Sequence, residues 1–150
     1  MAKKFLKVLW IACSLMLLIP AISFSAGNKN LTCDTKFPVI LAHGTGGAAK
    51  ILGFVDYWWG IPDALENEGA EVYATTVNGM DGTEAKAEQF RKQFLQIQAV
   101  SSASEFNIIA HSHGTLYARY AISNLKLSPY VKSLTSIAGP HRGMMLADII

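Results

Sequence analysis

A serine between small residues, Ser112, has the surroundings in this sequence that best suit nucleophilic chemistry. A short apolar run, 106–110, leads into it, and a segment compatible with a helix follows. Ala110 and Gly114 stand where a sharp turn from strand to helix would crowd larger side chains. This layout is typical of a nucleophile elbow, which lifts a serine hydroxyl clear of a sheet. The usual pattern is Gly-x-Ser-x-Gly, so Ala110 leaves the match one residue short, and the motif alone is a weak signal.

Attack by a serine also needs fixed hydrogen-bond donors, because negative charge develops on the attacked carbonyl oxygen. In an elbow, one donor is the backbone N–H of the residue after the serine, which here is His113. The second donor normally comes from the loop after an earlier strand. A glycine-rich loop at 43–47 follows an apolar run, and the N–H of Thr45 is the predicted second donor. Thr45 and His113 together form the predicted oxyanion hole.

Other chemistries fit these residues less well. A glycine-rich loop after a strand can bind phosphate, but 43–47 lacks both the Gly-x-Gly-x-x-Gly fingerprint and a Gly-Lys-Ser/Thr ending. Zinc ligation is disfavoured because the histidines show no His-x-x-x-His pairing and no partnering cysteines, so no metal site is predicted. The histidines are His43, His111, His113 and His141. The aromatic segment 57–59 suggests a substrate wall, although packing of a following helix is the favoured explanation, and Asp56 is expected to cap that helix.

Strands and helices alternate along the chain, which predicts an α/β fold. Apolar and alternating runs predict strands at 37–42, 70–77, 106–110 and 130–138. Periodic segments predict helices at 56–68 with Gly69 as the stop, from just after Asp81 to about 100, from 112 to about 125, and from 144 onward. This alternation implies a mostly parallel sheet with helices on both faces, whose ligands bind at the carboxyl ends of the strands. The 43–47 loop, Ser112 and the 139–143 loop all leave strands at that end.

The helix predicted after Asp81 carries an apolar stripe with a spacing of three and four residues. The stripe consists of Ala87, Phe90, Phe94 and Ile97. Asp81 and Glu84 have the spacing of a capping box at its start. The charged residues fall mainly off the stripe, which predicts a solvated outer face. They are Lys86, Glu88, Arg91 and Lys92.

The first 25 residues have the three-part pattern of a cleaved secretory signal peptide, and 26–150 form the predicted folded domain. Lysines at 3, 4 and 7 precede an uncharged apolar run at 8–22, and small residues follow. An uncleaved membrane anchor is the alternative, but fifteen apolar residues are short of the about 20 that a bilayer needs. Without those lysines the chain has 10 basic against 11 acidic residues, so no basic patch predicts nucleic-acid binding. Cys33 remains as an odd cysteine in a predicted secreted or periplasmic protein.

Together, these motifs resemble the secreted bacterial triacylglycerol lipases of the α/β-hydrolase fold. The resemblance rests on segments in the family's order and spacing that cover nearly all of 37–150. They are Phe37-Pro-Val-Ile-Leu-Ala-His-Gly, Val55-Asp-Tyr-Trp-Trp-Gly-Ile-Pro-Asp-Ala-Leu, Gly69-Ala-Glu-Val-Tyr-Ala, His111-Ser-His-Gly, Arg119-Tyr and Ala138-Gly-Pro-His-Arg-Gly. The resemblance implies Ser112 as the nucleophile, with the amides of Thr45 and His113 as the oxyanion hole. It also implies a lipid ester as the substrate.

The resemblance further implies a partial α/β-hydrolase fold, truncated after about four strands. In this family the acid and the base histidine follow the serine on later strands, so both are expected downstream of Ile150. His141 is a less favoured base, and Asp148 is the only acid after the serine. The resemblance implies no cofactor here, with calcium possible in full-length members, and it permits a dedicated foldase as a partner. The alternatives are an inactive exported half-fold that acts by binding, and a short-chain esterase or phospholipase.

Overall fold

A computed structural model describes residues 31–47, 50–51 and 55–145. The predicted signal peptide at 1–25 and Asp148 lie outside these residues, as does most of the helix predicted from Met144. The described elements are β1 (Val39–Ala42), β2 (Lys50–Ile51), β3 (Val55–Asp56), α2 (Ile61–Asn67), β4 (Val72–Thr75), α3 (Thr83–Val100), β5 (Phe106–His111), α4 (Gly114–Asn124), the 3₁₀ turn η1 (Ser128–Tyr130) and β6 (Val131–Ile137). No helix among them has the length and apolar character that a membrane span needs.

Four of these strands form one parallel sheet in the order β4-β1-β5-β6, as predicted. β1 and β5 are the two inner strands, and β1 pairs with β4 on one side and β5 on the other. The chain therefore moves to one side of β1 first and then to its other side, which makes β1 and β5 the switch point of the topology. Ligands of open α/β sheets bind in the crevice at the carboxyl ends of such strands. The predicted Thr45 loop and Ser112 follow those two strand ends.

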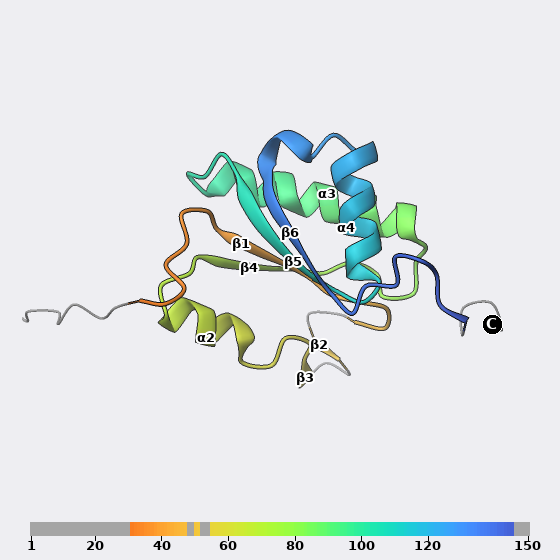
Figure 1. The fold of residues 1–150 in the computed structure, drawn as a ribbon, viewed down its shortest axis with the longest axis horizontal. Helices are drawn as coiled ribbons and strands as arrows, with labels where there is room; N and C mark the ends of the chain where they lie inside the picture. The colour runs from red at the N-terminus through yellow and green to blue at the C-terminus, as the bar shows by residue number, and fades with distance from the viewer. Residues whose placement is uncertain (1–30, 48–49, 52–54, 146–150) are drawn as a thin grey trace, which may run out of the picture. The chain divides into compact units, whose positions relative to one another are not determined.

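Helices cover both faces of the sheet (Figure 1). α3 and α4 pack together on one face, whereas α2 lies on the other. The larger core lies beneath α3 and α4, where strand residues meet the apolar stripe of α3. Fully buried members include Ile40, Phe90, Phe94, Phe106 and Ile108. Phe94 packs edge-on against Phe106 with ring centroids 5.1 Å apart, which is a favoured aromatic geometry.

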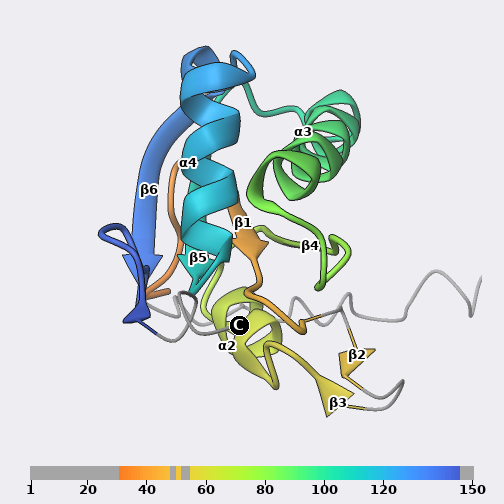
Figure 2. The same ribbon diagram turned by 90° about the vertical axis from the view of Figure 1, so that its right-hand side faces the viewer.

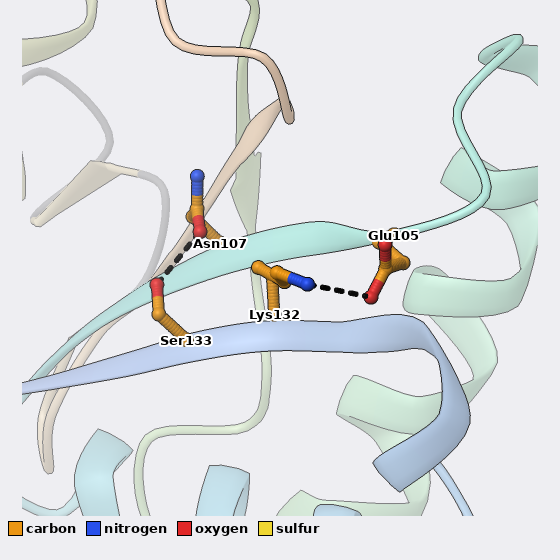
Figure 3. Close-up of polar contacts among 4 residues, drawn as sticks. All are labelled: Glu105, Asn107, Lys132 and Ser133. Atoms are coloured by element: carbon orange, nitrogen blue, oxygen red, sulfur yellow. Dashed lines mark hydrogen bonds and ion pairs between the residues drawn. The ribbon is translucent and has the colours of Figure 1, made fainter.

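The two edges of the sheet are β4 and β6 (Figure 2). Side chains fasten β6 to its single neighbour β5 (Figure 3). Ser133 donates a hydrogen bond to Asn107 Oδ1 at 2.7 Å, and Lys132 forms a 3.6 Å ion pair with Glu105. The amide of Asn107 also donates to the carbonyl of Phe37, so it links β6 through β5 to the entry of β1. Because the ion pair is exposed, we attribute the anchoring mainly to the ladder and to Asn107.

Three local predictions are wrong. Asp56 lies in β3, which pairs antiparallel with β2, and the cap of α2 is Gly60 instead. The capping box does not form, since α3 begins after Gly82 and has no side-chain cap. Asp81 instead accepts a hydrogen bond from Gln89 Nε2 at 2.6 Å. Lys86 is fully buried rather than solvated. The helix stop was predicted correctly, because Gly69 has a φ of 97°, which ends α2 with a left-handed residue.

Candidate active site

Ser112 occupies a strained turn between β5 and α4. Its φ is 54°, a left-handed value that a residue with a side chain adopts only when its surroundings impose it. The backbone holds this conformation from two sides. The N–H of Ser112 donates to the carbonyl of Ile137 at 2.9 Å, and its own carbonyl accepts from Thr115 Oγ1 at 2.7 Å. Such strain at a serine between a strand and a helix is the geometry of a nucleophile elbow.

Two glycines allow the elbow to approach the end of β1. A methyl group at Gly114 would lie 2.3 Å from the carbonyl oxygen of Ala42, so only glycine fits where α4 begins. A methyl group at Gly44 would lie 2.8 Å from Ser112 Cβ. The 43–47 loop therefore runs directly beside Ser112, where a second oxyanion donor is required. Ala110, which replaces the first glycine of the usual motif, is fully buried in the core.

His43 fixes the start of this loop as a neutral ring. Its Nε2 accepts a hydrogen bond from the N–H of Val77 at 3.0 Å, so the proton is on Nδ1, which donates to the carbonyl of Gly44 at 2.9 Å. Burial lowers the pKa of His43, and the charge of Lys86 lowers it further. The carbonyl of His43 accepts from the buried Tyr117 hydroxyl at 2.9 Å. His43 thus joins the loop to the segment after β4 and serves as a structural histidine.

Tyr57 joins the same loop to the strand that carries Ser112. Its hydroxyl accepts from the N–H of Gly44 at 3.0 Å and lies in hydrogen-bonding contact with His111 Nδ1. The aromatic segment therefore divides into three environments. Tyr57 contacts the site, Trp58 is buried at the second core cluster, and Trp59 is 76% exposed. Core packing accounts for Trp58 and in part for Tyr57, which packs against the same cluster, but not for the exposed Trp59.

His113 meets the 43–47 loop through its side chain. Its Nδ1 lies 3.0 Å from Thr45 Oγ1 and 3.0 Å from Lys86 Nζ, and its Nε2 lies 2.8 Å from Thr83 Oγ1. An ammonium group only donates, so Nδ1 is an acceptor and Nε2 carries the proton. Burial lowers the pKa of His113, and the charge of Lys86 acts in the same direction. The structure thus brings together Ser112, His113 and Thr45, which are the predicted site residues.

The structure does not bring His141 to Ser112. Its Nε2 lies 2.7 Å from Ser136 Oγ, and its Nδ1 lies 3.3 Å from Arg119 Nη1. Because the guanidinium only donates, Nδ1 accepts and Nε2 donates to Ser136. The ring therefore has the wrong tautomer to serve as a base for Ser136. Within the described residues, no side chain forms a hydrogen bond with Ser112 Oγ, so none of them is placed to take its proton.

The described residues also offer no metal site. No three His, Cys, Asp or Glu side chains among residues 31–47, 50–51 and 55–145 gather closely enough to hold an ion. Cys33 is a free thiol in this part of the chain. The calcium that is possible in full-length members therefore has no ligand set among these residues.

Sequence reasoning missed Lys86, Tyr57 and Tyr117 as residues that hold the site. Lys86 lies beside the buried stripe of α3, and a lysine next to Ala87 and one turn before Phe90 is a weak signal of burial. Tyr57 lay inside the helix predicted at 56–68, and its position there gave no signal of a contact with the 43–47 loop. Tyr117 follows Ser112 by five residues, and burial raises the pKa of its phenol.

Comparisons with known proteins agree with this architecture. Residues 38–149 match the family described as alpha/beta hydrolase fold. The chain is 39% identical over 120 residues to a triacylglycerol lipase of Pseudarthrobacter phenanthrenivorans, which covers 77% of this chain and 37% of that protein. It is 38% identical over 118 residues to a triacylglycerol lipase of Vibrio cholerae, which covers 78% of this chain and 36% of that protein.

A solved structure gives the same fold at lower identity. The mature form of Bacillus licheniformis lipase BlEst2 matches with a TM-score of 0.66 at 17% identity, over 75% of this chain and 44% of that one. The chain spans about a third of the length of the curated relatives named above. The strained serine between β5 and α4, the parallel sheet and the match over residues 38–149 lead to one conclusion. The chain belongs to the alpha/beta hydrolase fold family.

Proposed function

We propose that this chain is the part of a secreted, lipase-type serine hydrolase that carries the nucleophile and the oxyanion hole. Ser112 would attack the carbonyl carbon of a lipid ester. The observation that carries the proposal is the left-handed φ of 54° at Ser112, on a turn that Gly44 and Gly114 pack against β1. Strain of this kind persists only where surrounding structure imposes it, and it is concentrated at active sites.

The proposed chemistry is acyl transfer through a serine ester. The oxygen of Ser112 forms a bond to the carbonyl carbon, and the electron pair of the C=O bond moves onto its oxygen. The amides of Thr45 and His113 would stabilise that oxyanion, and each such donor is worth on the order of 3 kcal/mol. When the tetrahedral adduct collapses, the alcohol leaves and the acyl group remains on Ser112. The proton of Ser112 passes to a base that we place outside the described residues, and this base returns it to the departing alcohol oxygen. Water then attacks the acyl-serine in the same way, which releases the acid and restores Ser112.

A triacylglycerol is the proposed substrate because the two relatives named above are triacylglycerol lipases at 38–39% identity. Export through residues 1–25 belongs to the same proposal. A short-chain esterase is the second candidate of the same class, and a non-catalytic binding protein is the candidate of a different class.

Hydrolysis assays on the full-length protein distinguish these candidates. Emulsified long-chain triacylglycerol and a soluble short-chain ester are compared for the unmutated protein and for Ser112→Ala. The proposal predicts preference for the long-chain substrate and a loss of at least about 10³-fold in kcat with Ser112→Ala. The exposed Ser133→Ala is the matched control and keeps the activity. No hydrolysis of either ester by the folded unmutated protein would contradict the proposal and favour the binding protein.

A further inference from the structure

Lys86 is a buried cation with no carboxylate in ion-pair contact: burial lowers its pKa, and the charge of Asp81 opposes that effect only in part. It lies in the first turn of α3 and has no exposed surface. Among the described residues it forms no ion pair, since the ion pair recorded there joins Lys132 and Glu105. Burial of an unpaired ammonium group is costly, and lysine is almost never fully buried without a partner. The structure must therefore compensate through other contacts.

The Lys86 ammonium group has two hydrogen-bond acceptors. One is connected to the 43–47 loop, which carries the proposed donor Thr45, and the other is the side chain of the second proposed donor, His113. Nζ donates to the carbonyl of Gly79 at 2.9 Å, and the same carbonyl accepts from the N–H of Gly46 at 3.0 Å. Gly46 directly follows Thr45, the proposed donor in the loop. Nζ also donates to His113 Nδ1 at 3.0 Å, which anchors the residue that supplies the other donor.

Close packing makes this arrangement sensitive to small displacements. A methyl group at Gly79 would lie 2.7 Å from the carbonyl oxygen of Gly47, so the 79 segment lies directly against the loop. Thr45 Oγ1 contacts His113 Nδ1, the same nitrogen that Lys86 contacts. The 43–47 loop is therefore connected to Lys86 both through Gly79 and through His113. A donor in an oxyanion hole must lie within a few tenths of an ångström of its position to act fully.

We propose that Lys86 is a positioning residue that holds the two oxyanion donors of this site, Thr45 and His113, in register with each other. It would do so by hydrogen bonding at once to the Gly79 carbonyl and to the ring of His113. The proposal rests on the proposed serine hydrolase function. In this proposal α3 carries no reacting group, but its Lys86 fixes the distance between the 43–47 loop and the turn at Ser112.

The two hydrogen bonds of Lys86, to the Gly79 carbonyl and to His113 Nδ1, are called the clamp below. The clamp also fixes the tautomer of His113. Donation from Lys86 requires an unprotonated Nδ1, which leaves the proton on Nε2 facing Thr83. The titratable groups around this cluster are Lys86 on α3, Tyr117 beside the ring on α4, His43 after β1, and Asp81 before α3. Protonation of His113 would place a second positive charge against Lys86 and remove the acceptor, so the clamp requires a neutral ring.

Histidine-ring NMR and amide hydrogen exchange on the full-length protein test the proposal without relying on catalysis. In the unmutated protein, His113 must be protonated on Nε2 when neutral. Lys86→Met removes the donor and nearby charge, so the pKa of His113 rises by about 0.5 unit or more, and exchange of the Gly46 amide accelerates about tenfold or more. Lys86→Arg restores both values in large part, whereas Lys92→Met on the exposed side of α3 changes neither.

Two results would overturn the proposal. One is a folded Lys86→Met protein with unaltered His113 titration and Gly46 exchange. The other is an Nδ1-protonated His113 in the unmutated protein, and this measurement remains decisive where Lys86→Met fails to fold. In the active enzyme, Lys86→Met should lower kcat about 10- to 100-fold with little change in KM. Absence of these NMR and exchange changes in Lys86→Met refutes the role of Lys86, whereas absence of Ser112 reactivity refutes the hydrolase, so the two failures are distinguishable.

Discussion

Gly114→Ala is expected to destabilise the protein because α4 begins in contact with the end of β1. The added methyl carbon would lie 2.3 Å from the carbonyl oxygen of Ala42 and 2.8 Å from that of His43. Tolerable carbon–oxygen contacts begin near about 3.3 Å, so roughly 1 Å of movement is required. β1 cannot provide it, since Ala42 is fully buried between two paired strands. Overpacking of this kind costs about 1–3 kcal/mol, and we expect the upper end here.

Urea unfolding of the full-length protein measures this effect. Gly82→Ala is the matched control, because a methyl group there meets nothing within 4 Å and the φ of −69° suits alanine. We expect Gly82→Ala to change the free energy of unfolding by less than about 1 kcal/mol. The difference between the two variants isolates the steric contact from the general effect of a glycine-to-alanine change. Equal unfolding free energies for the two variants would refute the packing argument at the elbow.

Two further predictions concern the residues that hold the 43–47 loop. Tyr57→Phe leaves the Gly44 N–H and His111 Nδ1 without their shared hydroxyl, so urea unfolding should show a loss of about 1–2 kcal/mol, and an unchanged midpoint would contradict the assigned contacts. The lowered pKa values of His43 and His113 predict a loss of stability on acidification. The unfolded state binds more protons than the native state below the ordinary histidine pKa of 6.5, so the free energy of unfolding should fall as pH drops from about 7 toward 5. The slope is at most about 1.4 kcal/mol per pH unit for each ring, and a flat profile would show that neither ring is held neutral.

The fold was largely predictable because its main elements have strong local signals. β1 is an unbroken apolar run, β5 is apolar apart from Asn107 and His111, and α3 has a regular apolar stripe that buries Phe90 and Phe94. The sharp turn at Ser112 was predictable from its context, since a strand precedes the serine, a helix follows it and small residues flank it. The strain at Ser112 follows from the same turn.

The contacts that hold the site were not predictable, because they depend on segments distant in sequence. Lys86 is buried only because Gly79 and His113 supply acceptors, and no local pattern around Lys86 reveals either partner. The short β2–β3 pair replaced the predicted helix start at Asp56 for a similar reason, since a two-residue pairing has no periodicity to detect. The failed capping box shows that the correct spacing does not specify which residue becomes the cap.

Covalent labelling of the full-length protein with a fluorophosphonate is the most direct test of the central claim that Ser112 is an activated nucleophile. The probe phosphonylates a serine whose proton a base removes, with loss of fluoride. Mass spectrometry of the digested adduct should locate one probe per protein on the peptide that contains Ser112, and Ser112→Ala should abolish it. No adduct on the folded protein, or an adduct that persists in Ser112→Ala, would contradict the assignment.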